Sequence, residues 1–349
     1  MDMQKLEALL GSVVNDLGAA ANAALIITGH KLGLFRTLAE AGPLTSAELA
    51  ARTGTGERYV REWLSAQAAS GLVTYAADSG RFAMSPEQAA IFADPDSPVF
   101  MAAGFEGLRA AYIDEPRLTE AYRTGKGFGW GERCNCLFCG TEQFFRPTYR
   151  AHLLNDWLPA LEGMVDRLRS GGRIADIGCG HGASSLIMAE AFPQAHVTGF
   201  DFHRASIERA RAQAKAQGLT NIGFEIQTAQ GYTSGDYDLV TVFDALHDMG
   251  DPVGAVANIR RSLKSDGALM VIEPMAGDRL EDNLHPVGRL YYAFSAATCV
   301  PASLAQDVGL ALGAQAGEAR LRDVLQQGGF TRIRRAAQTP FSIILEARP

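Results

Sequence analysis

The sequence predicts an α/β protein in which a doubly wound parallel sheet follows a mostly helical N-terminal region. From residue 172 onward, short apolar runs alternate with segments of helical periodicity, which is the pattern of consecutive β-α-β units. Before residue 72, apolar residues recur at helical spacing, and a short alternating hairpin pattern follows them. We therefore expect two domains joined by an intervening segment.

Size and composition fit this division. The chain has 349 residues, 47% of them hydrophobic and 20% charged, with a formal net charge of -7. Such a charge gives no general attraction to nucleic acid or to an anionic membrane. The N-terminus has acidic residues in place of the basic start of a signal peptide, and its apolar run 19–28 is shorter than the ~20 residues that span a bilayer. We expect a cytoplasmic protein with reduced cysteines, no membrane partner and, in run 19–28, a buried helix face.

Residues 1–98 predict a helical domain that ends as a winged helix. Helical spacing covers 6–17 and 23–39, and Thr45 with Glu48 forms a capping box before a short helix. Another helix is expected at 56–70, and a hairpin after it. A winged helix suggests DNA binding, but residues 1–100 hold 7 basic against 11 acidic side chains, a poor composition for contacting phosphates.

Residues 99–165 form the predicted linker and pocket-covering helical segment. This stretch is rich in aromatic residues and contains the cluster C-N-C-L-F-C at 134–139, and a helix is expected at 152–168. An irregular aromatic segment close in sequence to the sheet suits the cover of a substrate pocket. Packing between domains explains it equally well.

Residues 166–349 form the predicted sheet domain. The expected strands are 173–177, 196–200, 222–227, 237–243 and 268–272, with a closing antiparallel pair at 331–338 and 341–347. Helices are expected at 183–192, 204–217 and 251–263, between 227 and 237, and over 285–327 with an interruption near Pro301. Because such units place strands in parallel, ligands are expected at the carboxyl edge of the sheet.

The glycine turn after strand 173–177 is the most informative stretch. Asp176 ends the strand, Gly178 and Gly180 follow, and helical spacing resumes at 183. Glycines let a ligand touch the backbone, and the amino end of the next helix attracts an anionic group. The glycines alone also satisfy a dinucleotide fingerprint, so the cofactor must be inferred from their surroundings.

Those surroundings resemble class I S-adenosylmethionine (SAM)-dependent methyltransferases, which have a Rossmann-like fold. The segment V-T-G-F-D ends the second strand at Asp201, and D-Y-D-L-V-T-V-F-D-A-L-H-D lies where such enzymes have their fourth strand. The resemblance implies SAM as cofactor, with Asp201 accepting both ribose hydroxyls and Asp176 near the methionine end. Further cofactor contacts are expected at Gly178, Gly180, Phe202, Gln227, Thr228, Ala229, Phe243 and Asp244. Residues 227–229 depart from the family, because many members have an acid there against the adenine amine.

The chain is also similar to small-molecule O-methyltransferases, in which a winged helix of this kind mediates dimerisation. A bacterial group of winged-helix methyltransferases shares D-I-G-C-G-H-G-A-S, F-D-x-L-H-D-M-G-D-P and E-P-x-A-G-D with it. The resemblance implies a homodimer and, through L-H-D, a general base at His247 just beyond strand 237–243. Asp244, Asp248 and Glu273 are candidates to orient this imidazole or to hold a donor of the substrate, and the sequence does not rank them.

We expect a small-molecule acceptor, with oxygen as the methylated atom. Three cysteines, Cys134, Cys136 and Cys139, suggest an alternative in which their sulfurs hold a thiophilic ion, a metalloid or a thiol substrate. Three reduced thiols packed beside Phe138 explain the cluster equally well, so the metal content stays open. A SAM-sensing winged-helix regulator is a further alternative. An NAD-dependent oxidoreductase is disfavoured, because no Tyr-x-x-x-Lys pair follows the fourth strand.

Overall fold

The computed structural model describes residues 1–233 and 235–349, which divide into two compact units. One unit consists of residues 1–110 and 135–148, and the other of residues 111–134 and 149–349. The chain therefore passes from the first unit to the second, back and out again between residues 110 and 149. The predicted segment 99–165 contains all of these crossings, and its division from the flanking domains stays a prediction.

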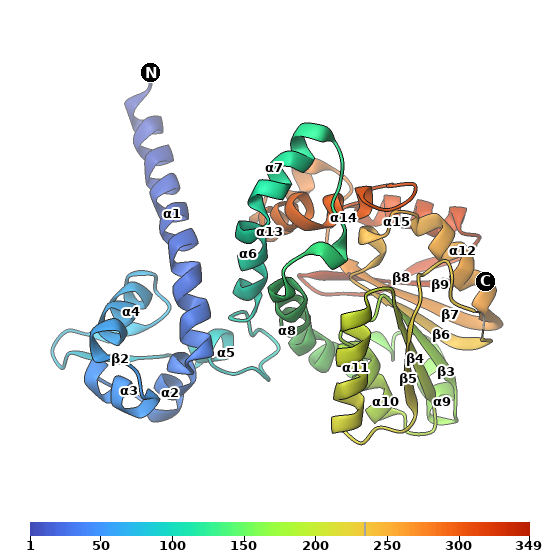
Figure 1. Cartoon of the computed structure of the whole chain (residues 1–349), viewed down its shortest axis with the longest axis horizontal. Helices are drawn as coiled ribbons and strands as arrows, with labels where there is room; N and C mark the ends of the chain where they lie inside the picture. Colours follow the sequence, from blue (N-terminus) through green and yellow to red (C-terminus); the bar gives the residue numbers. More distant parts are fainter. Residues whose placement is uncertain (234) are drawn as a thin grey trace. The chain divides into compact units, whose positions relative to one another are not determined.

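The first unit is helical with one small hairpin (Figure 1). Its elements are α1 Met3–Lys31, α2 Leu34–Ala41, α3 Ser46–Thr53, α4 Glu57–Ala69, β1 Thr74–Ala76, β2 Arg81–Ala83, α5 Pro86–Phe92, most of α6 Gly104–Ile113, and most of α8 Asn135–His152. The predicted capping box at Thr45 and Glu48 is present, and Arg81 of the hairpin binds the same Glu48 carboxylate. Helices and hairpin follow in the order of a winged helix, as predicted.

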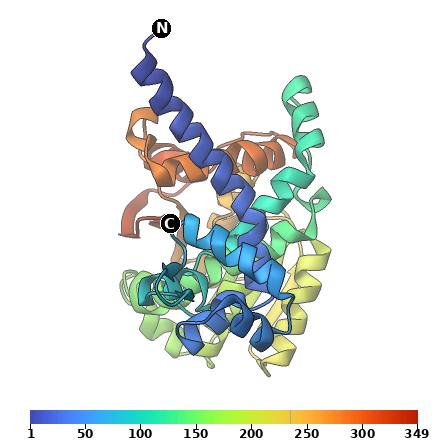
Figure 2. The same ribbon diagram turned by 90° about the vertical axis from the view of Figure 1, so that its left-hand side faces the viewer.

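Helix α1 is one continuous helix in both views (Figures 1 and 2), and the chain turns only at Gly33, whose φ is 69°. The predicted buried face at 19–28 is only partly correct. Within α1 the buried residues are Asn22, Ala23, Ile26 and Gly29, while the apolar residues nearer the N-terminus are exposed. By length and composition alone, α1 is also long and apolar enough to cross a membrane.

The second unit contains the predicted sheet, with strand order β5-β4-β3-β6-β7-β9-β8. Its strands are β3 Arg173–Ile177, β4 His196–Asp201, β5 Ile222–Ile226, β6 Tyr237–Phe243, β7 Leu263–Pro274, β8 Arg332–Gln338 and β9 Ser342–Arg348. The pairs among β3 to β7 are parallel, and β9 pairs antiparallel with both β7 and β8. The doubly wound sheet and its antiparallel closing pair are confirmed.

Helices cover both faces of this sheet. One apolar cluster packs α10 Ala183–Ala191 and α11 Arg204–Ala216 against the β4–β5 end, and another packs α12 Pro252–Ser262 and α15 Gly317–Gln327 against β6 and β7 (Figure 1). The remaining helical elements are α7 Glu115–Thr124, η1 Trp130–Glu132, η2 Leu153–Trp157, α9 Met164–Arg169, η3 Leu246–Asp248, η4 Leu280–Asn283, α13 Pro286–Phe294, η5 Ser295–Cys299 and α14 Val300–Leu304.

Two sequence-based expectations for this unit were wrong. The helix expected between β5 and β6 is absent from the described residues 227–233 and 235–236, where the chain forms turns. The helix expected from residue 152 to 168 is divided, because α8 ends in the π-helical turn Leu153–Trp157 and α9 begins only at Met164. Neither error affects the strand order.

Candidate active site

The glycine turn adopts a conformation that only glycine tolerates well. Gly178, Gly180 and Gly182 have φ values of 73°, 52° and 81°, in the left-handed region. A Cβ on Gly178 would lie 2.8 Å from the Cβ of Ala245, in the loop after β6. The backbone nitrogens of Gly178 and Cys179 donate to the Phe200 carbonyl of β4. These contacts bring the ends of β3, β4 and β6 together at the carboxyl edge of the sheet.

Asp201 lies at the mouth of this turn. Its Oδ2 accepts a hydrogen bond from the Gly180 nitrogen at 2.9 Å, and its Oδ1 accepts one from the His203 nitrogen at 2.8 Å. Burial raises the pKa of this carboxyl, although both backbone hydrogen bonds oppose the shift. Each carboxylate oxygen has a further lone pair that can accept a ribose hydroxyl.

The side chains expected around the adenine lie beside Asp201. Phe202 is 49% exposed and offers a flat apolar face. Gln227 and Thr228 are exposed just after β5, and the Gln227 nitrogen donates to the Asp201 carbonyl. Ala229 is partly buried against the core. A side-chain amide and a hydroxyl therefore stand available where many family members have an acid.

Asp176 is directed away from the open side of the turn. Its carboxylate is fully buried and accepts hydrogen bonds from Ser184 Oγ at 2.7 Å, Ser185 Oγ at 2.5 Å and Thr241 Oγ1 at 3.1 Å. Burial raises its pKa, and the three hydroxyls oppose that shift. Asp176 thus ties the first turn of α10 to β6 and supports the shape of the glycine turn.

His247 lies in the turn η3 directly after β6 and is oriented by Glu273 at the end of β7. The Nδ1 of His247 is 2.5 Å from Glu273 Oε2, while Glu273 Oε1 accepts the Leu246 N–H at 3.0 Å. Both side chains are buried, at 4% and 2% exposure. Of the three acids that the sequence left unranked, Glu273 is the one that holds Nδ1.

The second imidazole nitrogen, Nε2, lies 3.4 Å from Asp248 Oδ1. Burial by itself lowers the pKa of His247, but the charges of Glu273 and Asp248 outweigh it and raise this pKa well above the ordinary value. The ring therefore holds a proton more tightly than an ordinary histidine does. To act as a base it must first lose its proton.

Asp244 is the first residue after β6 and has an unusual conformation. Its φ is 47°, which is uncommon for a residue with a side chain. Tyr149 of α8 donates a hydrogen bond to Asp244 Oδ2 at 2.7 Å, whereas the buried Oδ1 has no hydrogen-bond partner. Burial and the charge of Glu273 raise the pKa of Asp244 to about 7. Phe243 and Trp157 pack with Tyr149 to form an aromatic cluster around this carboxyl.

The cysteine cluster does not form the predicted three-sulfur site. Cys134 and Cys136 are joined by a disulfide, and Cys139 is not part of a disulfide. The expectation that all five cysteines are reduced is therefore wrong. With two sulfurs bonded to each other, one thiol remains and cannot supply three ligands.

Sequence reasoning missed Tyr149 and Cys299. Tyr149 lies 95 residues before its partner Asp244. Cys299 is a buried free thiol in the π-helical turn η5, close to His247 and Asp248. Neither has a local motif. The interruption expected near Pro301 lies instead at residues 305–316, because the chain stays helical from Pro286 through Leu304.

Comparison with known proteins identifies two domain families. Residues 168–329 match a family described as "Methyltransferase domain", and residues 20–93 match one described as "Rv2258c-like winged HTH domain". Aklanonic acid methyltransferase DauC of Streptomyces sp. strain C5 is 34% identical over 109 residues, which are 30% of this chain and 50% of that protein. The 27-O-demethylrifamycin SV methyltransferase of Amycolatopsis mediterranei is 35% identical over 112 residues, 31% of this chain and 40% of that protein. The chain thus spans about half, or less, of the length of these curated relatives.

Solved structures share the fold over the full length of the chain. The mitomycin 7-O-methyltransferase MmcR has a TM-score of 0.67 at 21% identity and covers 100% of both chains. Human N-acetylserotonin methyltransferase in complex with SAM has a TM-score of 0.70 at 20% identity and covers 98% of this chain and 97% of that one. At these identities the likeness shows a common fold.

Proposed function

We propose that this chain, which carries a methyltransferase domain at residues 168–329 and an Rv2258c-like winged HTH domain at residues 20–93, methylates an oxygen atom of a small molecule with SAM. The observation that carries the proposal is the position of His247. His247 lies in the loop after β6, and the glycine turn lies directly after β3, the parallel neighbour of β6. A buried imidazole therefore lies beside the cofactor seat at the same edge of the sheet.

The residues of the turn fit SAM. Three left-handed glycines leave open backbone, the anchored Asp201 carboxylate can accept ribose hydroxyls, and exposed Phe202 can stack on the adenine. When bound, SAM supplies an electrophilic methyl group on a sulfonium, which is transferred to the attacking oxygen. The protein contributes position, exclusion of water and a base for the hydroxyl proton.

In this proposal the acceptor hydroxyl takes the place of Asp248 at Nε2 of His247. Glu273 holds Nδ1 in its protonated form, so Nε2 is the nitrogen that accepts the hydroxyl proton. Since the charged neighbours raise the pKa of His247, the ring is a stronger base than an ordinary histidine. Turnover is therefore expected to rise with pH above the ordinary histidine range of about 6.5.

The alternatives raised by the sequence gain no support. Methylation of a thiophilic substrate required three cooperating sulfurs, and two of them form a disulfide. A DNA-binding regulator required free basic residues on the presumed recognition helix α4. Its two arginines instead pair along the helix, Arg58 with Glu62 and Arg61 with Glu57.

We also propose that the protein is a cytoplasmic homodimer, with α1 as part of the interface. Exposed apolar residues recur along α1 at alternating spacings of three and four, which is the a/d pattern of a helix that pairs with another helix. These residues are Met3, Leu6, Leu10, Val13 and Leu17. A second copy of this chain offers the same seam, which explains the apolar surface of α1 without a membrane.

Thermal unfolding with ligands tests the enzymatic proposal. SAM and its demethylated product should each raise the melting temperature, because a ligand that binds only the native state adds about 2.7 kcal/mol of stability at 100 times its Kd. NADH should have no effect. Stabilisation by NADH, together with no response to SAM, would overturn the assignment. Transfer of tritium from labelled SAM to a panel of phenolic acceptors then tests the reaction itself.

A further inference from the structure

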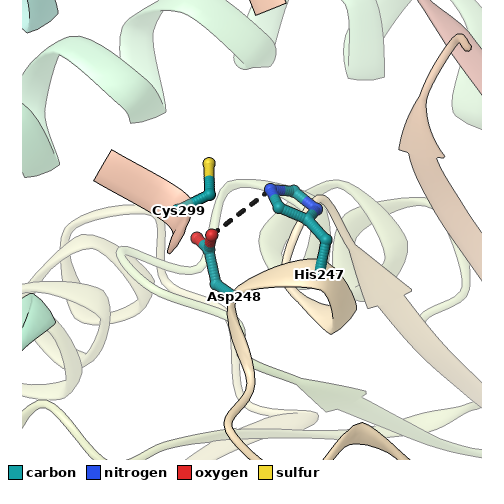
Figure 3. A group of neighbouring side chains, drawn as sticks. All are labelled: His247, Asp248 and Cys299. Atoms are coloured by element: carbon teal, nitrogen blue, oxygen red, sulfur yellow. Dashed lines mark ion pairs between the residues drawn. The ribbon is translucent and has the colours of Figure 1, made fainter. Parts of the chain in front are cut away.

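Three potential metal ligands converge beside the sheet edge. The Nε2 of His247, a carboxylate oxygen of Asp248 and the Sγ of Cys299 all lie within 4.8 Å of one another. Figure 3 shows the imidazole and the carboxylate facing each other, with the cysteine reaching the pair from another element. His247 and Cys299 are buried, and Asp248 is partly buried. His247 and Asp248 are adjacent in sequence, and Cys299 lies more than fifty positions further along the chain.

We propose that His247, Asp248 and Cys299 bind a divalent cation of the zinc class. One imidazole nitrogen, one thiolate and one carboxylate form a mixed donor set that suits Zn²⁺, and three protein ligands leave the fourth tetrahedral position open. Nitrogen and oxygen ligands of a tetrahedral zinc ion lie about 3.3 Å apart. The 3.4 Å between His247 Nε2 and Asp248 Oδ1 matches this spacing.

The sulfur requires only a small adjustment. In a tetrahedral site, sulfur and nitrogen ligands are about 3.5 Å apart. Cys299 Sγ lies within 4.8 Å of the other two ligand atoms, so its distance to His247 Nε2 has to shorten by no more than about 1.3 Å. Cys299 ends the π-helical turn Ser295–Cys299, a type of helix irregularity that often occurs at functional sites. Its thiol is not part of a disulfide.

The surrounding structure already holds two of the ligands in place. Glu273 binds Nδ1 of His247 at 2.5 Å and so directs Nε2 toward the centre of the cluster, as carboxylate partners of metal-binding histidines do. Ser303 Oγ of α14 donates to the Met249 carbonyl at 2.8 Å, and Gln306 Nε2 donates to the Asp248 carbonyl at 2.8 Å. The turn that contains His247 and Asp248 is thereby fastened to the helix that follows Cys299.

The local charges favour a cation. Asp248 Oδ1 is inaccessible to solvent, and its 3.4 Å separation from His247 Nε2 is too long for a strong hydrogen bond. Arg133 is a buried guanidinium that lies 3.6 Å from Asp114, and its charge also acts on Asp248. With Asp114 offsetting Arg133, the carboxylates of Asp248 and Glu273 still leave an excess of negative charge beside the cluster. A bound metal ion would replace this long contact with direct coordination of Asp248 Oδ1 and His247 Nε2.

The bound ion would occupy the nitrogen that serves as base in the proposed reaction. Resting on that proposed function, we expect Zn²⁺ to inhibit methyl transfer in competition with the acceptor and to leave SAM binding intact. Metal binding itself does not depend on methyl transfer. It can therefore be measured even if no acceptor is found.

Cobalt titration of the full-length protein tests the site. The protein is purified under reducing conditions, stripped with a chelator, desalted and titrated with Co²⁺, which reports a cysteine ligand through thiolate-to-cobalt charge-transfer absorption. Wild type should show this band at one equivalent, and Zn²⁺ should abolish it. Cys299→Ser should lack the band, and Glu273→Gln should weaken Co²⁺ binding about 10- to 100-fold. Cys179→Ser, which alters another buried free thiol, is the matched control and should keep the band.

Each result decides the proposal. A band that persists in Cys299→Ser, or a wild type with no band, would overturn it, as would a band lost only when Cys134, Cys136 and Cys139 are replaced by serine. The melting-temperature shift with SAM shows whether Cys299→Ser is folded. If that variant does not fold, Asp248→Asn replaces it, and unchanged Co²⁺ affinity in Asp248→Asn would equally reject the site.

Discussion

Replacing Glu273 with glutamine should disable His247 by changing its tautomer. In the wild type, one oxygen of Glu273 accepts the Leu246 N–H and the other faces His247 Nδ1. The Leu246 nitrogen can only donate, so the glutamine oxygen must remain there and its amide nitrogen must face Nδ1. Nδ1 then becomes the acceptor and the proton moves to Nε2, where the ring can no longer act as a base.

The size of the effect follows from this geometry. The corresponding carboxylate-to-amide change in the serine protease triad lowers kcat by about 10⁴-fold for the same reason, and we expect a loss approaching that value. The variant also loses one charge-assisted hydrogen bond, worth about 1.5–3 kcal/mol. Because the wild-type pair raises the pKa of His247, its stabilisation is complete below about pH 6.5 and is lost as pH rises through the raised pKa. The stability difference between wild type and variant should therefore shrink at high pH.

Three measurements separate a positioning role from mere damage to the fold. Turnover with tritiated SAM should fall, and the melting shift with SAM should persist. The rising limb of the pH–rate profile should move to lower pH, because the variant lacks the Glu273 charge that raises the pKa of His247. Glu281→Gln changes an exposed carboxylate and serves as control. Turnover of Glu273→Gln within threefold of wild type, with an unmoved pH profile, would refute the tautomer argument.

Three other substitutions test the remaining assignments. Asp201→Ala should abolish the melting shift with SAM, since each charged hydrogen bond to the ribose is worth about 1.5–3 kcal/mol; retained micromolar binding would show that the ribose lies elsewhere. His247→Ala should keep SAM affinity and slow transfer to a hydroxyl by about 10²- to 10⁴-fold; full activity would assign the base to another residue. Leu10→Glu combined with Val13→Glu should convert a dimer into a monomer in light scattering, whereas Leu280→Glu, also at an exposed leucine, should not.

Local sequence signals account for the choice of residues on the expected cofactor side of the site. The glycine turn, the end of β4 and the loop after β6 each combine an apolar run with a distinctive polar residue. Parallel strands then bring those residues to one edge. Asp201 and His247 could therefore be chosen before any coordinates, because backbone topology alone places them together.

The hydrogen-bond partners of these residues could not be predicted, because the sequence does not show strand register or side-chain direction. Glu273 orients His247 because β6 and β7 pair in the register Phe243 with Ile272, which places the next residue of β7 opposite the loop after β6. Asp176, by contrast, lies on the expected strand but faces three hydroxyls in the interior. Register and side-chain direction are set by packing across the sheet, which periodicity alone does not determine.

The cysteines also show that spacing in the sequence does not determine which side chains meet in space. Three neighbouring cysteines attracted a functional interpretation because of their spacing, and a disulfide between the first two removes it. The cysteine that does meet His247 and Asp248 is isolated in sequence. Its position depends on a π-helical turn for which the sequence offers no reliable signal.

The edge of the sheet combines several unfavourable features that a folded protein keeps only where they serve a site. Asp244 has a left-handed backbone, which costs about 1–3 kcal/mol for a residue with a side chain. Its carboxyl is desolvated, and one of its oxygens has no hydrogen-bond partner. Asparagine tolerates the left-handed region better than most residues and can still accept the Tyr149 hydroxyl through its carbonyl.

We therefore predict that Asp244→Asn stabilises the unliganded protein while impairing its function. Because burial raises the pKa of Asp244 to about 7 from an unfolded value near 3.9, the wild-type carboxyl destabilises the fold increasingly as pH rises between these two values. That shift corresponds to at most about 4 kcal/mol above pH 7, and less in practice since the side chain is only partly buried. Urea unfolding at pH 8 should show the variant to be more stable than wild type, and at pH 4 the advantage should nearly vanish. Asp307→Asn, at an exposed position, should change neither value. An equal gain at both pH values would assign the effect to backbone conformation instead of buried charge.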